Sequence, residues 1–169
     1  MIACKNGVNW LYQLDKDEHW KPEHPVKLDY TLECYDEKGN LWLIVHEDGS
    51  FTVKAGYAWN GCTPKLGFFD ILIGTQDGVV TKKTGKPKAY YATMIHDSLY
   101  QFLPDMPKDI PLTRKLADEY FLEILKRDEF ILRGIYWLAV RIFGGLAMQG
   151  RRQVTRKTKG RMELISTES

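Results

Sequence analysis

The residues best suited to chemistry lie in an apolar, aromatic run at positions 90–102, YYATMIHDSLYQF, in which His96 and Asp97 are adjacent. At helical spacing His96 falls on the same face as Ala92 and Leu99, so the run predicts a helix that turns an imidazole toward the interior. An inward histidine beside a carboxylate suits acid–base or metal chemistry, and it equally suits a hydrogen-bonded packing network.

Two further charged residues lie on or beside apolar helical stripes later in the chain. Asp118 follows Ala117 at the edge of one stripe, and Arg141 shares a helical face with Trp137. Charged side chains are rarely buried unless they are paired or bind a metal. We therefore expect one internal cluster of four polar side chains: His96, Asp97, Asp118 and Arg141.

Two interpretations of this cluster stay open. In one, His96, Asp97 and Asp118 are catalytic residues that hold a divalent metal (Mn, Zn or Mg), and the metal activates a water for hydrolysis. In the other, Arg141 pairs with an aspartate, His96 bonds a backbone carbonyl, and the network fixes helix packing. The structural interpretation is preferred, with no cofactor expected, because an arginine repels a bound cation.

The segment GYAWNGCTPK, 56–65, is predicted to be a loop from its glycine, asparagine and proline residues. Cys62 in this loop could act as a nucleophile with His96 as its base, although a free cysteine is more often a small buried apolar residue. Asn60 and Thr63 suit the ordinary role of bonding their own backbone in a turn. The chain has no GxxxxGK, GxGxxG or GxSxG motif, so nucleotide cradling and esterase chemistry have no support.

Hydrophobic periodicity predicts an α+β fold class, with a small antiparallel β-meander followed by a three-helix C-terminal layer. Alternation and tight turns predict three strands, at residues 26–34, 41–46 and 51–55. Three helices are predicted next, one from residue 88 to the proline-rich PDMPKDIP, one over 112–128 and one over 129–148.

Charge divides the chain into a near-neutral body and a basic end. Residues 1–149 are predicted to form a single domain, and residues 150–169 a basic C-terminal arm with two acidic residues, Glu163 and Glu168. Such an arm suits an acidic partner surface or a polyanion, and equally a solvated tail. Nucleic acid is a minor candidate because no aromatic residues interleave the charges. The expected partner-binding residues of the arm are Arg151, Arg152, Arg156, Lys157, Lys159 and Arg161.

Cysteine usage and the apolar segments bear on the compartment. The three cysteines are widely spaced and odd in number, which fits a reducing compartment better than a disulfide framework. The first twenty residues lack the pattern of a secretory signal. Residues 130–148 are apolar, but Arg133 and Arg141 interrupt them, which favours a buried or interfacial helix over a membrane span.

Four blocks of the chain, over roughly residues 51–145, together form a recognisable series: FTVKAGYAWNGCTPK, AYYATMIHDSLYQF, LADEYFLEILK and IYWLAVRIFGG. In this order they resemble the family known as domain of unknown function 1353, which is common in bacteriophages and prophages. The resemblance implies a phage protein and transfers no activity. Where the family loop usually has an aspartate, this chain has Asn60, and an amide there would weaken any metal site.

These observations lead to one main functional hypothesis and one alternative. The main hypothesis is a structural or accessory protein of a bacteriophage, a tail-associated virion component. Its partners are expected to be other phage proteins or copies of itself, bound through loops and the basic arm, and its location the virion or the cytoplasm of a bacterial host. The alternative is the metal-dependent hydrolase with its His-Asp/Asp site.

Overall fold

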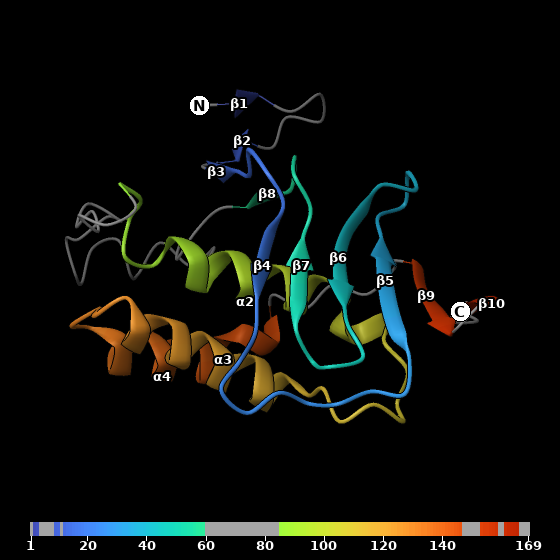
Figure 1. Cartoon of the computed structure of the whole chain (residues 1–169). Coiled ribbons are helices and arrows are strands. Elements are labelled where there is room, and N and C mark those ends of the chain that lie inside the picture. The colour runs from blue at the N-terminus through green and yellow to red at the C-terminus, as the bar shows by residue number, and fades with distance from the viewer. Residues whose placement is uncertain are drawn as a thin grey trace.

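The molecule combines an antiparallel sheet with a layer of helices on one face, as seen in the computed structural model (Figure 1). The fold class is therefore α+β, as predicted. The structure describes residues 2–3, 9–10, 12–59, 85–146, 153–158 and 161–165.

The main sheet has six strands in the order β10-β9-β5-β6-β7-β4. Two smaller two-stranded sheets pair β1 with β2 and β3 with β8. The strands are β1 Ile2–Ala3, β2 Asn9–Trp10, β3 Tyr12–Gln13, β4 Glu18–Trp20, β5 Thr31–Tyr35, β6 Leu41–Val45, β7 Phe51–Val53, β8 Ala58–Trp59, β9 Gln153–Thr158 and β10 Arg161–Ile165.

The predicted meander corresponds to β5, β6 and β7, which are neighbours in the sheet and antiparallel. Their inward side chains alternate along each strand and are buried, as Leu32 and Cys34 are on β5. The turns use glycines with positive φ, Gly39 (80°) after β5 and Gly49 (76°) after β6, where L side chains are strained. The turn glycines and the alternation of buried side chains therefore both agree with the predicted antiparallel meander.

The first predicted strand, residues 26–34, is placed too early. In the structure β5 begins at Thr31, because β6 ends at Val45, opposite Leu32, and the chain then turns away. Residues before Thr31 have no strand to pair with on that side. Leu28 instead donates its backbone N–H to the carbonyl of Glu47 in the turn.

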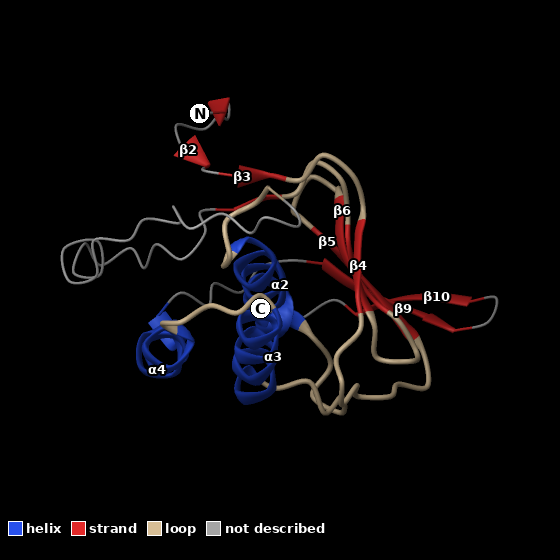
Figure 2. Cartoon of the chain, turned by 60° about the vertical axis from the view of Figure 1, so that its left-hand side comes forward, coloured by secondary structure: helices blue, strands red, loops and turns tan. Residues whose placement is uncertain are grey.

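Within the described residues, three α-helices lie on one side of the main sheet. Figure 2 shows α2 and α3 side by side next to the strands, with α4 farther from the sheet and packed on α3. Between α2 and α3 runs a short 3-10 helix, Leu103–Asp105, at the proline-rich break. The helices are α2 Tyr90–Phe102, α3 Arg114–Arg127 and α4 Arg133–Phe143, followed by a second short 3-10 helix, Gly144–Leu146.

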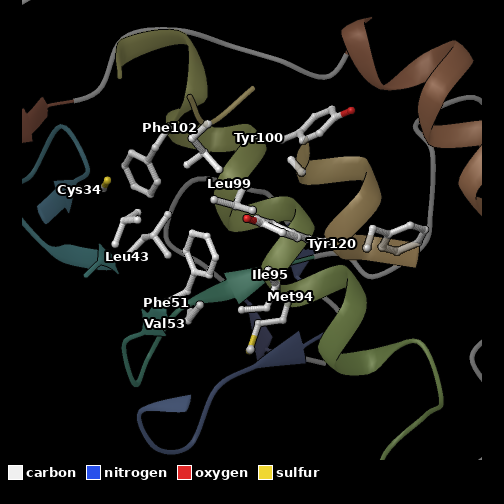
Figure 3. Packing of buried hydrophobic residues seen from close by; sticks show 14 of the residues in the cluster. Cys34, Leu43, Phe51, Val53, Met94, Ile95, Leu99, Tyr100, Phe102 and Tyr120 are labelled. Atoms are coloured by element: carbon white, nitrogen blue, oxygen red, sulfur yellow. The ribbon is translucent and has the colours of Figure 1, made fainter. Parts of the chain in front are cut away.

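The core lies between the sheet and α2. Leu43 and Phe51 of the sheet meet Ile95 and Leu99 of α2, and all four are buried (Figure 3). Cys34 is part of the same core, and burial raises the pKa of its thiol, so it is not poised as a nucleophile.

The third predicted helix, 129–148, is shorter at both ends in the structure. Glu129 has φ 53°, a left-handed conformation that ends α3. The backbone N–H of Phe130 bonds the carbonyl of Leu125, and that of Glu129 bonds the carbonyl of Lys126, which is the Schellman pattern of a helix end. This turn aims α4 back across α3. None of the helices in the described ranges has the length and hydropathy of a membrane span.

The C-terminal arm differs most from expectation. Residues 150–169 were predicted to lie outside the domain, but β9 pairs with β5 along its length and β10 pairs with β9. Val154 on β9 is buried against the core. The high charge of the segment gives no indication of a strand. One inward apolar residue, Val154, is enough for the segment to join the sheet, because the edge of β5 offers free backbone groups.

Truncating Val154 should destabilise the whole fold. Val154→Ala removes two buried methyl groups, so we expect the free energy of unfolding to fall by about 2 kcal/mol in urea titrations. The matched control is Lys157→Gln on the same strand, whose ammonium is exposed and bonds Glu33 at 3.2 Å. That change should cost less than about 1 kcal/mol. Equal small effects for both would contradict the placement of β9 in the sheet.

Candidate functional site

His96 lies in the middle of α2 and is almost fully buried, with 6% of its surface exposed. Its Nε2 lies 2.9 Å from Oδ1 of Asp118 on α3, and its Nδ1 lies 3.6 Å from Oδ1 of Asp97. The ring packs against the rings of Tyr100 and Phe121. The imidazole is therefore held between two carboxylates. The structural interpretation had expected a bond from His96 to a backbone carbonyl instead, and the described residues provide none.

Asp118 is the centre of the cluster, and none of its surface is exposed. Oδ1 accepts hydrogen bonds from Tyr100 at 2.5 Å and from His96. Oδ2 accepts a bond of 2.8 Å from Nη1 of Arg141 on α4. Both carboxylate oxygens thus have partners, and the partners come from all three helices.

Of the four polar groups predicted to meet, three are bonded directly and the fourth, Asp97, joins through His96. His96, Asp118 and Arg141 are joined directly by hydrogen bonds. Asp97 touches the cluster through His96, and about a third of its side chain is exposed. Arg141 pairs with Asp118, and in the described part of the chain the contacts of Asp97 with the cluster come from His96 alone. Arg141 therefore neutralises the deeper of the two aspartates.

Two members of the cluster were not predicted as part of it, Tyr100 and Arg114. The guanidinium of Arg114 donates to the hydroxyl of Tyr100 at 3.1 Å and to the carbonyls of Val140 and Arg141. Arg114 thereby caps the C-terminal end of α4, where unpaired carbonyls collect. The signal in the sequence is spacing, since Tyr100 is one helical turn after His96 and Arg114 one turn before Asp118.

The glycine pair that follows α4 leaves room for this cluster. A Cβ atom at Gly144 would lie 2.7 Å from the hydroxyl oxygen of Tyr100, and one at Gly145 would lie 3.0 Å from Nη1 of Arg114. The block IYWLAVRIFGG therefore closes on the network with its two smallest residues. Gly144 has an ordinary helical φ of −59°, so close approach is what requires a glycine there.

Charge pairing sets the protonation of the cluster. Burial opposes charge on His96, but the bonds to Asp118 and Asp97 outweigh it and raise the pKa of the imidazole. Burial also opposes charge on Asp118, but bonds from His96, Tyr100 and Arg141 outweigh it and lower the pKa of the carboxyl. Burial and the bond to Asp118 raise the pKa of Tyr100. The geometry favours an imidazolium and a guanidinium on one carboxylate.

The arrangement supports charge neutralisation more readily than metal binding. Across the described ranges, no group of three or more histidine, cysteine, aspartate or glutamate side chains is placed to hold a metal ion. For Asp118 to ligate a cation, Arg141 would have to leave Oδ2 and its positive charge would have to move away. The proposed metal ligands His96, Asp97 and Asp118 remain a prediction.

Several other predicted residues do not reach this cluster or lie outside the described residues. Asn60, Cys62 and Thr63 lie outside them, so the proposed pairing of Cys62 with His96 stays a prediction. Lys157 bonds Glu33 on the neighbouring strand. Of the other arm residues, Arg156 lies in β9 and Arg161 in β10, while Arg151, Arg152 and Lys159 are outside the described ranges.

Comparison with models of known protein families, with curated proteins and with solved structures finds no match in any of the three. The family resemblance of the four blocks therefore stays a prediction, and the case for function depends on the geometry.

Replacing Asp118 by asparagine should strongly destabilise the fold. Asp118→Asn keeps the shape but leaves His96 and Arg141 without their shared anion, so we expect a loss of about 3–5 kcal/mol in the free energy of unfolding. The matched control is Glu119→Gln, the next residue on α3, which is exposed and pairs with Lys115 at 3.8 Å. Its cost should stay below about 0.5 kcal/mol. A near-neutral Asp118→Asn would show that the network does not hold the helices.

Stability should depend on pH in the direction set by His96. Its folded-state pKa lies above the ordinary 6.5, so its contribution is complete below that pH and is lost as the pH rises through the raised value. We expect the free energy of unfolding to decline above pH 6.5 in the wild type. The decline should be smaller in Asp97→Asn, in which His96 keeps its bond to Asp118. In His96→Gln the part of the decline that comes from the imidazole should be lost.

At low pH the loss of stability comes from Asp118, because its pKa is lowered in the folded state. Its contribution to the free energy of unfolding is complete above pH 3.8 and is lost as the pH falls through the pKa of the folded state. An NMR titration of the His96 imidazole in the wild type checks the decline in stability above pH 6.5 without any substitution. A midpoint at or below 6.5, or equal pH slopes in the wild type and His96→Gln, would overturn this assignment.

Proposed function

We propose that this protein is a structural or accessory protein of a bacteriophage, associated with the tail, which works by binding neighbouring subunits and not by catalysis. The observation that carries the proposal is the apolar surface of α4. Within the described residues, the large apolar side chains that are exposed all lie on α4 or in the turn before it: Ile131, Ile135, Leu138, Ile142 and Phe143. Grouped exposed apolar side chains of this kind mark interaction surfaces.

The polar cluster supports the non-catalytic part of the proposal. Asp118 is fully buried and has both oxygens bonded, and the two arginines fix α4 on the other helices. A site built for a substrate needs an open position beside its reacting groups. Here the groups that could react bond one another, so their best-supported role is to hold the helices rigid.

The phage context is supported by the resemblance of the four sequence blocks, while the odd number and wide spacing of the cysteines fit a reducing compartment such as the cytoplasm of a host. The basic arm is a second candidate contact surface. Its strand β10 is an edge of the main sheet, where backbone groups are free to meet a partner. Because β9 is part of the sheet, removing residues 150–169 would damage the fold as well as the surface, so substitution is the better test.

The test measures incorporation of the chain into particles. In phage particles purified from a producing strain, mass spectrometry should detect the wild-type chain at a fixed stoichiometry. Replacing Arg151, Arg152 and Lys159 by glutamine should reduce its incorporation several-fold without lowering Tm. The matched control replaces Lys108 and Lys115, which are exposed and lie elsewhere, and should leave incorporation unchanged. Absence of the wild-type chain from particles would refute the structural role.

A melting experiment separates the proposal from the hydrolase alternative. Tight binding of a metal to the folded state raises Tm, so the proposal expects no rise with Mn²⁺, Zn²⁺ or Mg²⁺. A rise that disappears in Asp97→Asn would favour a metal-dependent hydrolase instead.

A further inference from the structure

The exposed surface of α4 has a regular spacing. We use the name α4 stripe for four of its residues, Ile131, Ile135, Leu138 and Ile142, which are 87%, 51%, 52% and 60% exposed. Their separations of four, three and four positions are those of a helix that packs lengthwise against another helix. Three of the four lie within α4 and Ile131 lies in the turn before it.

The polar cluster fixes which way this stripe faces. Arg141 bonds Asp118 from one side of α4, and Arg114 holds the carbonyls at its C-terminal end. Tyr136 and Val140 pack on the core from the same inner side. α4 therefore cannot turn the stripe inward without breaking the bonds to Asp118. The indole N–H of Trp137 is also buried without an acceptor among the described residues, so the monomer leaves this helix incompletely satisfied.

Resting on the function proposed above, we infer that the α4 stripe binds the α4 stripe of a second copy of this chain, antiparallel across a two-fold axis between Ile135 and Leu138. The four–three–four spacing reads the same in both directions. A two-fold axis at its centre places Ile131 opposite Ile142 of the other copy and Ile135 opposite Leu138. Each side chain then meets an apolar partner, as a self-complementary interface requires.

Charge favours a second copy over a charged occupant. α4 carries two charged residues, and Arg141 is engaged by Asp118, which leaves Arg133 as the exposed charge of the helix. Binding to anionic lipid or nucleic acid needs a row of free basic side chains. An antiparallel helix pair also sets the positive end of each helix beside the negative end of the other.

The available area predicts a weak dimer. The exposed parts of the stripe and Phe143 amount to on the order of 500 Å² per copy, against about 800 Å² per partner in stable complexes. Dissociation in the micromolar range is the expected result, so a high local concentration, as in an assembled particle, would favour the pairing.

Sedimentation equilibrium on the full chain tests the inference, over roughly 1–500 µM. The wild type should shift from monomer to dimer across this range. Leu138→Glu puts a charge at the centre of the stripe and should leave a monomer with unchanged Tm, because that side chain is exposed. Lys108→Glu, at an exposed site elsewhere, should dimerise like the wild type.

Cysteine cross-linking tests the antiparallel geometry in a chain with Cys4 and Cys62 replaced by serine. Ile131→Cys mixed with Ile142→Cys should oxidise readily to a mixed dimer. Either variant alone should not, because eleven positions, most of them in α4, separate equivalent residues by roughly 16 Å. Cross-linking of each variant with itself would indicate a parallel pair and overturn the inference.

Three other outcomes would also overturn it. These are a monomer at every concentration, a dimer that survives Leu138→Glu, and a Leu138→Cys variant whose thiol is protected from labelling in the monomer, which would mean that the chain covers its own stripe. A failure here with normal incorporation into particles would leave the proposed function standing. Loss of incorporation with an intact dimer would refute the proposed function alone.

Discussion

A carboxylate that no water reaches must be paired, and in this protein that requirement is met by residues of three different helices. Asp118 on α3 is bonded by His96 and Tyr100 of α2 and by Arg141 of α4. While it is buried, the negative charge is fully compensated only when all three helices are docked, since removing any partner leaves a buried charge undercompensated. The polar cluster therefore determines how the helices lie on one another, while apolar contacts with the sheet hold α2 in place.

Local features of the chain make this convergence possible. Thr113 caps the start of α3, and the left-handed Glu129 ends it, so the chain turns back and brings Arg141 over Asp118. At the far end of α4, Gly144 lets the backbone come close to Tyr100. The helix that results is attached mainly through polar contacts on one side and exposes apolar residues on the other. The same polar contacts thus hold α4 on the other helices and leave its apolar side exposed.

Much of this could be predicted from patterns along the chain, and the remainder depends on partners distant in sequence. The period of two and the tight turns predicted the meander, and the period of 3.6 predicted three helices with inward polar residues. Periodicity could not predict that Arg114 would reach the end of α4, because an arginine in a first helical turn usually faces water. Nor could the charge of the segment predict β9, since the burial of Val154 depends on pairing with the edge of β5, more than a hundred residues earlier.

The manner in which α4 is attached has a consequence for the motions of the protein. No residue of α4 is fully buried, whereas α2 and α3 are anchored in the core. Elements with little apolar burial open at a lower free energy than the rest of a domain, and their amide hydrogens exchange first. α4 is accordingly the part that would separate as a unit, exposing the Asp118 carboxylate to solvent while the sheet stays folded. A neighbouring molecule bound to its outer side would slow that excursion.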